Sequence, residues 1–375
     1  MTTSFSFRMF TAIGVLIAAS CLWGCSGSDT PPAGAGAESG PAASDAAADL
    51  GFETGLTEAG VETAPPLTKL ENLVYVEFIL NTHDWVFSDQ SIATVNKVID
   101  LHEKYKVPVE IYLTDPMVRL YVSKSPSLVE RLKTSPFVSI SHHVRPPAPY
   151  YSDYDWYGLD KLSDSELKTL LTSYEEHAID MKTGLPSATE AGGYDFLKKT
   201  IGYAPYVVTM AAGPGKVATT LADIYKSKGA LFTLTHSATG SEWGTKTNGL
   251  LLRPETVEVK AYEIKDDVDF ETKILNPAMT TVGTKRPAFV NLKWHEDNFY
   301  TSGTPWGNVY YSDAKAKTMK PPPYDTSAYE PVEKKTDAQK ATQWKRYEAA
   351  LSYLLAHGET YKIIGVRDLK SLAGL

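Results

Sequence analysis

Runs of apolar residues broken by polar turns divide the first part of the folded region into alternating strands and helices. Short continuous apolar runs rich in Val, Ile, Tyr and Phe predict buried strands. Between two of these runs, Ile92, Val95 and Val98 recur at the spacing of a helix. Strands that alternate with helices are typical of a parallel sheet buried on both faces. The predicted strands are residues 73–80, 107–113 and 137–141, and the predicted helices are one that ends at residue 104 and one at residues 127–133.

The pattern is looser in the middle of the chain and becomes regular again toward its end. Ser163 and Glu166 have the spacing of a capping box and predict a helix at residues 163–183. Residues 298–332 include three consecutive prolines and predict a long surface loop. A final helix is predicted at residues 337–356. Further strands are predicted at residues 206–210, 230–235, 256–264, 288–294 and 361–366.

The beginning of the chain has a different pattern. Arg8 precedes an apolar run at residues 9–23, which is typical of a cleavable export signal covering residues 1–24. The run is too short for a confident membrane-spanning helix of about 18 to 20 apolar residues. Residues 25–66 consist mainly of Ala, Gly, Pro, Ser and acidic residues and predict a disordered tether. Residues 67–375 have a size typical of one α/β barrel, a single domain.

Composition narrows the possible chemistry and partners. Cys21 and Cys25 are the only cysteines, and removal of the signal would take Cys21 away, so any metal site must use His, Asp and Glu. Asp and Glu number 45 against 37 Lys and Arg, and the net charge of −8 argues against a nucleic-acid partner. The 22 Tyr and 7 Trp can fill a core and can also stack on sugar rings.

Polar residues gather where predicted strands end, which is where parallel α/β folds place their functional groups. Five of the eight histidines lie at such ends. A catalytic zinc ion typically takes three protein ligands, for which imidazole and carboxylate are suitable. The sequence therefore favours a divalent metal site, with zinc as the expected ion. The residues at the strand ends are His83, Asp84, His142, His143, His236, His295, Glu296 and Asp297.

The adjacent histidines of this set cannot both face the same way, because successive side chains of a strand point to opposite faces. His143 shares its parity with the small residues Ser139 and Ser141, so we expect His143 to point inward and His142 to pack outside. The alternative for both is hydrogen bonding to loop carbonyls. The candidate metal ligands are Asp84, His142, His143 and His236.

His295 is a candidate acid or base, and the aromatic residues Trp294 and Tyr300 beside it predict a wall on which a sugar ring could stack. We expect Asp297 to lie in a solvated turn. Arg145 has three possible roles: it could clamp a substrate carboxylate, keep a neighbouring aspartate ionised, or form a salt bridge within its loop.

Leu22, Trp23, Gly24 and Cys25 resemble the lipobox of bacterial lipoproteins. The resemblance implies that residues 1–24 are removed and that Cys25 carries a lipid. The protein would then be anchored to a membrane at the bacterial cell envelope. The alternative is an ordinary secretory signal that contains cysteines.

The order of the segments and their strand-end residues resembles the polysaccharide deacetylase homology domain. That family has a distorted (β/α)7 barrel, and its first strand ends in two aspartates, of which the first is the catalytic base and the second a metal ligand. His83 and Asp84 stand at these positions, so the resemblance implies those roles for them. The family's second motif is a strand ending in two histidines four residues apart. His143 matches the first of them, and Pro147 stands at the second.

Two later segments extend the resemblance. Residues 191–194 and 201–203 are similar to glycine and tyrosine signposts of the family's third motif, without its arginine. Residues 292–295 resemble the last motif, whose histidine acts as the general acid, and this implies that role for His295. The resemblance also implies a glycan substrate and a divalent metal.

Three functional hypotheses remain from the sequence. The preferred one is a metal-dependent, deacetylase-like hydrolase of a glycan, with Trp85, Trp294 and Tyr300 lining the sugar site. The second is a degenerate barrel that binds a glycan or a protein partner without catalysis, which is motivated by Pro147. The third is a metal-independent glycosidase that uses a pair of carboxylates, as many glycosidases do. Its carboxylates would be Asp84 and Glu296.

Overall fold

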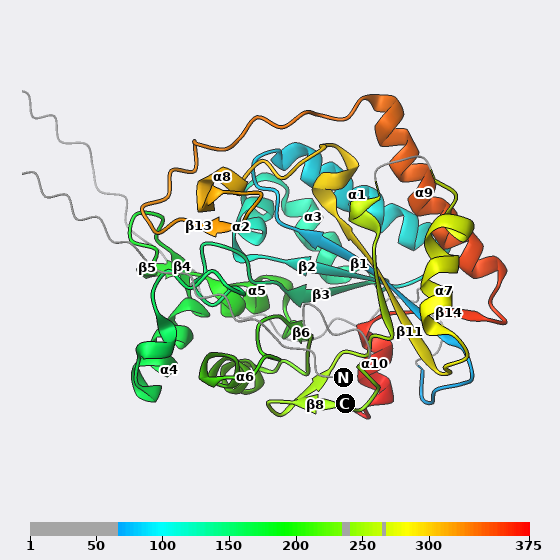
Figure 1. Cartoon of the computed structure of the whole chain (residues 1–375), viewed down its shortest axis with the longest axis horizontal. Coiled ribbons are helices and arrows are strands. Elements are labelled where there is room, and N and C mark those ends of the chain that lie inside the picture. The colour runs from blue at the N-terminus through cyan, green and yellow to red at the C-terminus, as the bar shows by residue number, and fades with distance from the viewer. Residues whose placement is uncertain (1–66, 235–240, 265–267) are drawn as a thin grey trace, which may run out of the picture. The chain divides into compact units, whose positions relative to one another are not determined.

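A curled and mostly parallel sheet forms the centre of the molecule (Figure 1). The computed structural model describes residues 67–234, 241–264 and 268–375. The ten strands of this sheet in the described ranges are β1 (Val74–Thr82), β2 (Val109–Leu113), β3 (Val138–His142), β6 (Val207–Val208), β7 (Phe232–Thr233), β8 (Lys246–Thr247), β9 (Leu250–Leu252), β10 (Val257–Lys260), β11 (Ala288–His295) and β14 (Tyr361–Ile364). They run in the order β10-β11-β1-β2-β3-β6-β7-β9-β8, and β14 pairs with β1. The predicted strand and helix alternation at the start of the folded region is confirmed.

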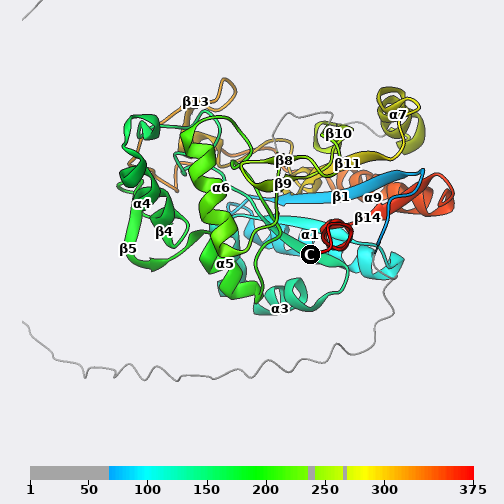
Figure 2. The ribbon, with the colours of Figure 1, turned by 90° about the horizontal axis from the view of Figure 1, so that it is seen from below.

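Helices surround the sheet, and two small antiparallel hairpins lie outside it (Figure 2). The hairpins are β4 (His177–Ile179) with β5 (Pro186–Ala191), and β12 (Tyr311–Asp313) with β13 (Thr318–Met319). The helices are α1 (Ser88–Tyr105), α2 (Asp115–Lys124), α3 (Pro126–Thr134), α4 (Asp164–Tyr174), α5 (Gly193–Ile201), α6 (Lys216–Lys228), α7 (Asn276–Val282), α8 (Gly307–Tyr310), α9 (Asp337–Ala356) and α10 (Val366–Leu372). No helix in the described ranges is long and apolar enough to cross a membrane.

Alternate residues of each central strand face opposite sides, and this parity separates the core from the site. Val76 and Phe78 of β1 pack with Val98 of α1 in the main apolar core, on the outer side of the sheet. On the inner side, Ile79 of β1 packs with Val366 of α10 in a smaller apolar cluster. The inner face is therefore the one that continues into the strand-end residues His83, His143 and His295.

The inner face of the sheet also buries an ionic cluster. Arg253 Nη2 lies 2.6 Å from Glu77 Oε2 and 2.8 Å from Glu110 Oε2. Arg253 Nη1 donates a hydrogen bond of 2.7 Å to the Tyr112 hydroxyl. All four side chains are buried. The guanidinium compensates the two carboxylates, which would be very unfavourable in this interior without it.

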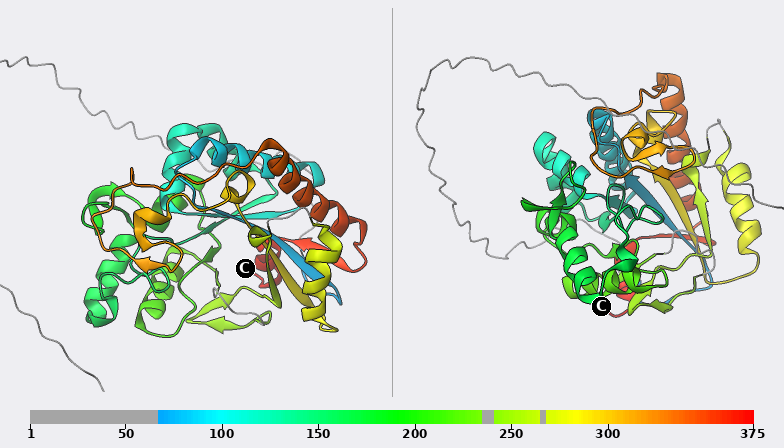
Figure 3. Two further views of the ribbon diagram at one scale, coloured as in Figure 1. Left: turned by 45° about the horizontal axis from the view of Figure 1, so that its top comes forward. Right: turned by 60° about the vertical axis from the view of Figure 1, so that its left-hand side comes forward.

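One chain segment contacts both ends of the ordered sheet. Residues 250–260 contain β9 and β10, of which β9 pairs with β7 and β10 pairs with β11, both in parallel. β14 pairs with the first half of β1, Val74–Glu77, and β2 pairs with its second half, Ile79–Thr82. Because residues 250–260 contact both ends of the strand order, the sheet is curled rather than open and flat (Figure 3).

Two element predictions are wrong. The helix predicted at residues 163–183 ends as α4 at Tyr174, since Glu175 is buried and accepts hydrogen bonds from the Tyr150 and Tyr225 hydroxyls. The predicted start at Ser163 is confirmed, with the capping box present. Residues 298–332 are not a simple loop, because they contain α8 and the β12–β13 hairpin.

Candidate active site

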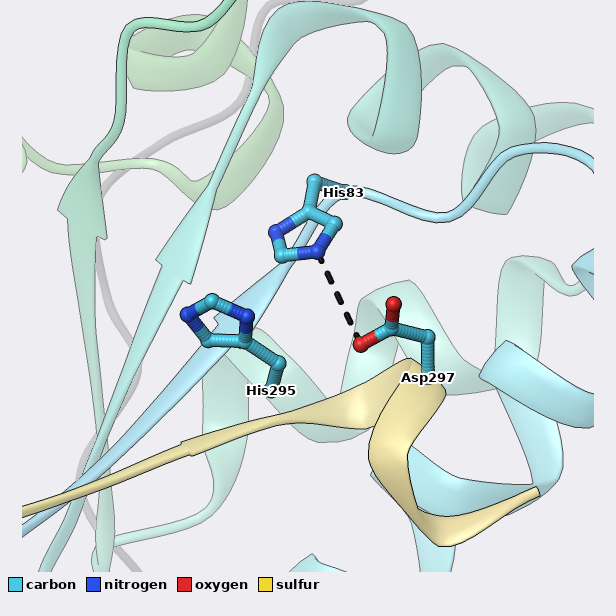
Figure 4. Close-up of side chains that lie close together, drawn as sticks. All are labelled: His83, His295 and Asp297. Carbon is cyan, nitrogen blue, oxygen red and sulfur yellow. Dashed lines mark ion pairs between the residues drawn. The ribbon is translucent and has the colours of Figure 1, made fainter. Parts of the chain in front are cut away.

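The ends of β1 and β11 bring two histidines and a carboxylate together (Figure 4). The two strands pair in parallel with Asn81 beside His295, so the residues after β1 lie next to the end of β11. The His83 and His295 rings meet edge to face with their centroids 4.6 Å apart. His83 Nε2 lies 3.7 Å from Asp297 Oδ1. These three residues, His83, His295 and Asp297, are called the His–His–Asp cluster below.

The His–His–Asp cluster has donor atoms and spacing that fit a metal ion. One ligand atom from each residue lies within 4.8 Å of the other two. Ligand atoms around a tetrahedral zinc ion are roughly 3.3 Å apart, and the separation between His83 Nε2 and Asp297 Oδ1 is 3.7 Å. Two imidazoles and one carboxylate are also a ligand set that catalytic zinc uses. Small rotations of the side chains would complete the fit.

The cluster contains buried polar atoms that lack partners. Both carboxylate oxygens of Asp297 and Nδ1 of His83 have no hydrogen-bond partner in the described part of the chain. Burying a carboxylate in this way is unfavourable by several kcal/mol. Burial, helped by the charges of His83, Arg145 and Lys293, holds the pKa of His295 well below its usual value. Its ring is therefore in the neutral form that binds metals, and a cation would compensate Asp297.

Asp84 and Glu296 do not join the cluster, and the predicted metal ligand Asp84 instead accepts hydrogen bonds from its own chain. Asp84 Oδ1 accepts the backbone N–H of Val86 at 3.0 Å, and its Oδ2 accepts the Tyr300 hydroxyl at 2.8 Å. Glu296 Oε1 accepts the backbone N–H of Asp84 at 2.6 Å and that of His83 at 2.5 Å. Burial raises the pKa of both carboxyl groups. The hydrogen bonds of these two carboxylates fix the backbone that follows β1. Neither residue lines a described cavity.

The two adjacent histidines point to opposite sides, as their parity predicts. His143 lines the same cavities as His83, and its Nδ1 lies 2.7 Å from the Val144 carbonyl oxygen. His142 packs against the rings of Tyr194 and Tyr225 and lines one of these two cavities from that side. Burial lowers the pKa of His142. Neither histidine belongs to the His–His–Asp cluster, so their predicted ligand roles are not supported by the geometry.

Two of the predicted sugar-binding residues are core residues. Trp294 is buried and stacks on Phe78 with a centroid distance of 5.5 Å, because it shares the outward parity of the strand residues Val290 and Leu292. Tyr300 is buried and donates its hydroxyl to Asp84. Trp85 and Arg145, in contrast, line a cavity beside the His–His–Asp cluster.

Two cavities meet at the cluster. The first, called the apolar lobe, has a volume of about 230 Å³ and is walled by Trp85, Val144, Pro147, Tyr150, Ile179 and Tyr310, among others. The second, called the polar lobe, has a volume of about 460 Å³ and is walled by Asn81, Thr209, Lys260, Tyr262, Lys293 and His295, among others. Four residues line both lobes, and they are His83, His143, Arg145 and Trp306.

The structure places three residues in the site that the sequence did not assign to it. Asp297 is buried rather than solvated, and its position two residues after His295 was a usable signal. Tyr262 stacks on His295 with a centroid distance of 4.1 Å. Trp306 meets the ring of His83 with a centroid distance of 5.5 Å. Trp306 lies in the long segment after β11, where the sequence has no periodic pattern that predicts contacts.

Two predicted site residues, His236 and Cys25, lie outside the residues that the structure describes. Their expected roles in metal binding and lipid attachment remain predictions.

Comparisons with known proteins give remote likenesses only. No family model and no curated protein matches the sequence. A crystal structure from Mycobacterium smegmatis that is described as a polysaccharide deacetylase covers 84% of this chain and 96% of its own, at 11% identity and a TM-score of 0.46. The peptidoglycan deacetylase PdaC from Bacillus subtilis covers 81% and 93%, at 13% identity and a TM-score of 0.33.

A third solved structure has a different activity in its description. The 4-alpha-glucanotransferase from Thermococcus litoralis covers 80% of this chain and is itself covered over 40% of its length, at 8% identity and a TM-score of 0.46. At these identities and TM-scores the three likenesses establish neither a family nor an activity for this chain.

Proposed function

We propose that this protein is a metal-dependent hydrolase that removes an acyl group from a glycan, and that the His–His–Asp cluster holds the metal. The observation that carries the proposal is the buried carboxylate of Asp297, which accepts no hydrogen bond in the described residues and lies beside two imidazoles that line the cavities. Zinc is the ion that this donor set fits best. The cluster takes the place of the ligand set that was expected from the sequence.

A divalent cation held by the cluster would polarise the carbonyl oxygen of an ester or amide bond. His143 is the proposed proton-transfer group, because it lines both lobes together with His83. The Val144 carbonyl can only accept a hydrogen bond, so the proton of the neutral His143 ring lies on Nδ1. The Nε2 atom is then the acceptor, which is the form that a general base requires.

The walls of the site support a carbohydrate as the substrate. Trp85 and Trp306 present aromatic surface to the apolar lobe, and Tyr262 and Trp306 do so in the polar lobe. Sugars bind to sites that combine aromatic faces with hydrogen-bonding groups, because a sugar ring has both apolar faces and polar edges. Asn81 and Thr209 supply such groups in the polar lobe.

The proposed fold is a distorted seven-stranded barrel, closed through residues 250–260. This segment pairs with β7 through β9 and with β11 through β10. The proposed barrel strands are β1, β2, β3, β6, β7, the β9–β10 segment and β11. In such a barrel, the strand ends that hold the His–His–Asp cluster would form the catalytic face.

The proposed location is the bacterial cell envelope, with a lipid on Cys25 as the anchor. The residues that support it are the apolar run at 9–23 and the lipobox-like residues at 22–25. A tether at residues 25–66 would let the site reach insoluble glycans close to the membrane.

The geometry disfavours the glycosidase alternative. Asp84 and Glu296 are both fully buried and are engaged by backbone N–H groups. Neither lines the two lobes, so no sugar in these cavities would contact them. The non-catalytic alternative predicts binding without turnover.

The proposal is tested by measuring acetate release from acetylated glycans by the full chain. The expected result is activity that a chelator removes and zinc restores, and that His83→Ala and His143→Ala abolish. His357→Ala is the matched control, since His357 lies at the end of α9, far from the lobes in the chain, and its ring contacts only Tyr353 in the side-chain interactions described. Activity that survives both the chelator and His83→Ala would refute the proposal.

A further inference from the structure

We propose that the substrate is acidic, and that Arg145 binds the carboxylate of a sugar acid in the polar lobe. This inference rests on the proposed glycan-acting function and adds the chemical class of the glycan. It concerns a residue outside the His–His–Asp cluster, three positions after His142 at the end of β3. Arg145 is one of four residues that line both lobes.

Arg145 is held in place on one side of its guanidinium. Its Nη1 donates a hydrogen bond of 2.7 Å to the Tyr151 hydroxyl. The guanidinium carbon lies 5.5 Å from the centre of the Tyr151 ring. Tyr151 also lines the polar lobe. The arginine is therefore oriented before any ligand arrives, which reduces the entropy cost of binding.

The other side of the guanidinium lacks an acceptor. Its Nε is buried and has no hydrogen-bond partner among the residues that the structure describes, and no acceptor is described for Nη2. A carboxylate binds the Nε and Nη2 edge of an arginine with two parallel hydrogen bonds. Tyr151 leaves this edge unoccupied, and because Nε is buried, the guanidinium must turn toward the polar lobe for a carboxylate to reach both donors.

The charge of Arg145 also lacks a counterion in the described part of the chain. No described carboxylate lies within ion-pair distance of it, whereas Arg119, Arg131 and Arg253 all have such partners. A partly buried guanidinium without a counterion is unfavourable. Within this site the proposed substrate carboxylate would supply the missing charge.

The rest of the polar lobe reinforces the positive potential. Four cationic side chains and two carboxylates line it, and they are Arg145, Lys260, Lys293, Lys317, Glu258 and Glu263. Lys293 pairs with Glu258, and Lys260 lies 3.8 Å from Glu263. Two cations, Arg145 and Lys317, therefore remain unmatched among these residues. This local excess occurs in a chain whose net charge is −8.

The test compares an acidic oligosaccharide with its uncharged twin. Oligogalacturonic acid and its methyl ester have nearly the same size and differ in charge, and each is titrated into the full chain by isothermal calorimetry. Charge-assisted hydrogen bonds contribute enough for the acid to bind about ten- to a hundredfold more tightly than the ester. Salt should weaken the acid more than the ester.

Variants assign the preference to Arg145. Arg145→Gln should remove the difference between acid and ester, and Arg145→Lys should keep only part of it because lysine lacks the two-pronged geometry. Lys317→Gln, the control in the same lobe, should keep most of it. Thermal unfolding curves that match the wild type establish that each variant is folded.

The outcomes separate this inference from the proposed function. Equal binding of acid and ester, or a preference that persists in Arg145→Gln, overturns the inference even if acetate release is observed. The inference is also overturned if millimolar inorganic phosphate displaces the acid and binds more tightly than the acid does, because the lobe would then be a phosphate site. A preference for the acid that depends on Arg145, in a protein without any turnover, supports the inference while the proposed function fails.

Discussion

Two aspartates at neighbouring strand ends have opposite surroundings. The Asp84 carboxylate accepts hydrogen bonds from two backbone N–H groups before α1 and from the Tyr300 hydroxyl. The Asp297 carboxylate has no hydrogen-bond partner in the described residues, although it is just as buried. Asp84 is therefore engaged within the fold, and Asp297 is the aspartate that we propose as a metal ligand.

The first prediction follows from this difference. Asp297→Asn is expected to weaken zinc binding by at least about ten- to a hundredfold, as loss of a metal-coordinating group does. Asp84→Asn is expected to bind zinc with unchanged affinity and to lose about 1 to 3 kcal/mol of unfolding free energy, because it disturbs the buried hydrogen bond from the Tyr300 hydroxyl. Zinc affinity is measured by competition with a chromophoric chelator. The reverse pattern would show that Asp84 is the ligand.

Arg253 gives a second prediction for a single residue. Arg253→Met leaves the Glu77 and Glu110 carboxylates buried without their cation, and should lower the unfolding free energy by about 3 to 5 kcal/mol. Burial already raises the pKa of Glu77 to about 7 in the presence of Arg253. Urea unfolding at pH 7 measures the effect, with Arg286→Met at the exposed surface as the control. A loss below about 1 kcal/mol would contradict the ionic account of this interior.

For single residues, the sequence predicted the direction of a side chain better than its function. The parity of Ser139 and Ser141 predicted that His143 points inward, and His143 lines both lobes, but His142, expected to pack outside, lines the apolar lobe as well. The same parity, applied to Val290 and Leu292, would have placed Trp294 in the core. Asp297 follows the end of β11 in a 3-10 turn, so strand parity does not predict its direction. The hydrogen bonds that engage Asp84 depend on Tyr300, 216 residues later in the chain, and no local pattern reveals such a contact.

His102 connects two elements that are far apart in the sequence. On α1, its Nε2 lies 2.7 Å from the hydroxyl of Tyr347 on α9, and its Nδ1 lies 3.0 Å from the Val107 carbonyl oxygen. The carbonyl can only accept, so Nδ1 donates and Nε2 accepts in the neutral ring. Burial lowers the pKa of His102 from 6.5 to about 4. The contact between the two helices therefore depends on an uncharged histidine.

The third prediction is the pH dependence that results. In the folded protein His102 resists protonation, whereas in the unfolded chain it binds a proton below pH 6.5. The unfolding free energy therefore keeps the whole contribution of neutral His102 above pH 6.5 and loses it progressively as the pH falls toward 4. The total loss is about 3 kcal/mol. His102→Gln removes the titration, so the variant's unfolding free energy should fall less steeply between pH 6.5 and 4. Parallel curves for the two proteins would contradict this assignment.

Two tryptophans on different elements give the fourth prediction. Trp306 precedes α8, lines both lobes and is buried in a small apolar cluster with Tyr310, so Trp306→Ala should weaken glycan binding and also lower the unfolding free energy. Trp294 of β11 packs on Phe78 and Tyr347, away from the lobes, so Trp294→Ala should cost about 3 to 5 kcal/mol of unfolding free energy without a direct effect on glycan binding. Calorimetric titration and urea unfolding of both variants measure these effects. Unchanged glycan affinity in a folded Trp306→Ala variant would contradict the role of Trp306 in the site.

Elements with strong signals were predictable from the sequence. The predicted helix at residues 337–356 matches α9, and the predicted strand at residues 288–294 matches β11 to within one residue. The helices α2, α5, α6, α7, α8 and α10 were not predicted. α2 begins with Asp115-Pro116 directly after β2, and α6 follows Gly215 in a segment whose glycines favoured a loop. Short helices of this kind depend on packing against the sheet rather than on their own sequence.

At the scale of the whole molecule, the proposed tether and lipid anchor would hold the site close to a membrane. The fifth prediction is that Cys25→Ser releases the protein from the membrane fraction and abolishes a lipid adduct on its N-terminal peptide. Detergent-phase partitioning and mass spectrometry of that peptide measure this. A wild-type protein that is secreted without lipid would favour the ordinary secretory signal.

The overall α/β class was predictable from the alternation of strands and helices, but the curvature of the sheet was not. One strand was expected in this region, at residues 256–264. Residues 250–260 instead form two strands, β9 and β10, which pair with strands at opposite ends of the sheet order. The buried Arg253 between them pairs with carboxylates of β1 and β2. Such closure results from contacts between distant segments, which hydrophobic periodicity does not encode.

The central claim is that His83, His295 and Asp297 hold a divalent cation. Anomalous diffraction at the zinc edge, from crystals of the full chain grown with zinc, tests it most directly. The account predicts one peak at about 2.0 to 2.2 Å from His83 Nε2, a ring nitrogen of His295 and a carboxylate oxygen of Asp297. A peak on Asp84 or His143 without these three ligands, or no peak at the junction of the two lobes, would contradict it.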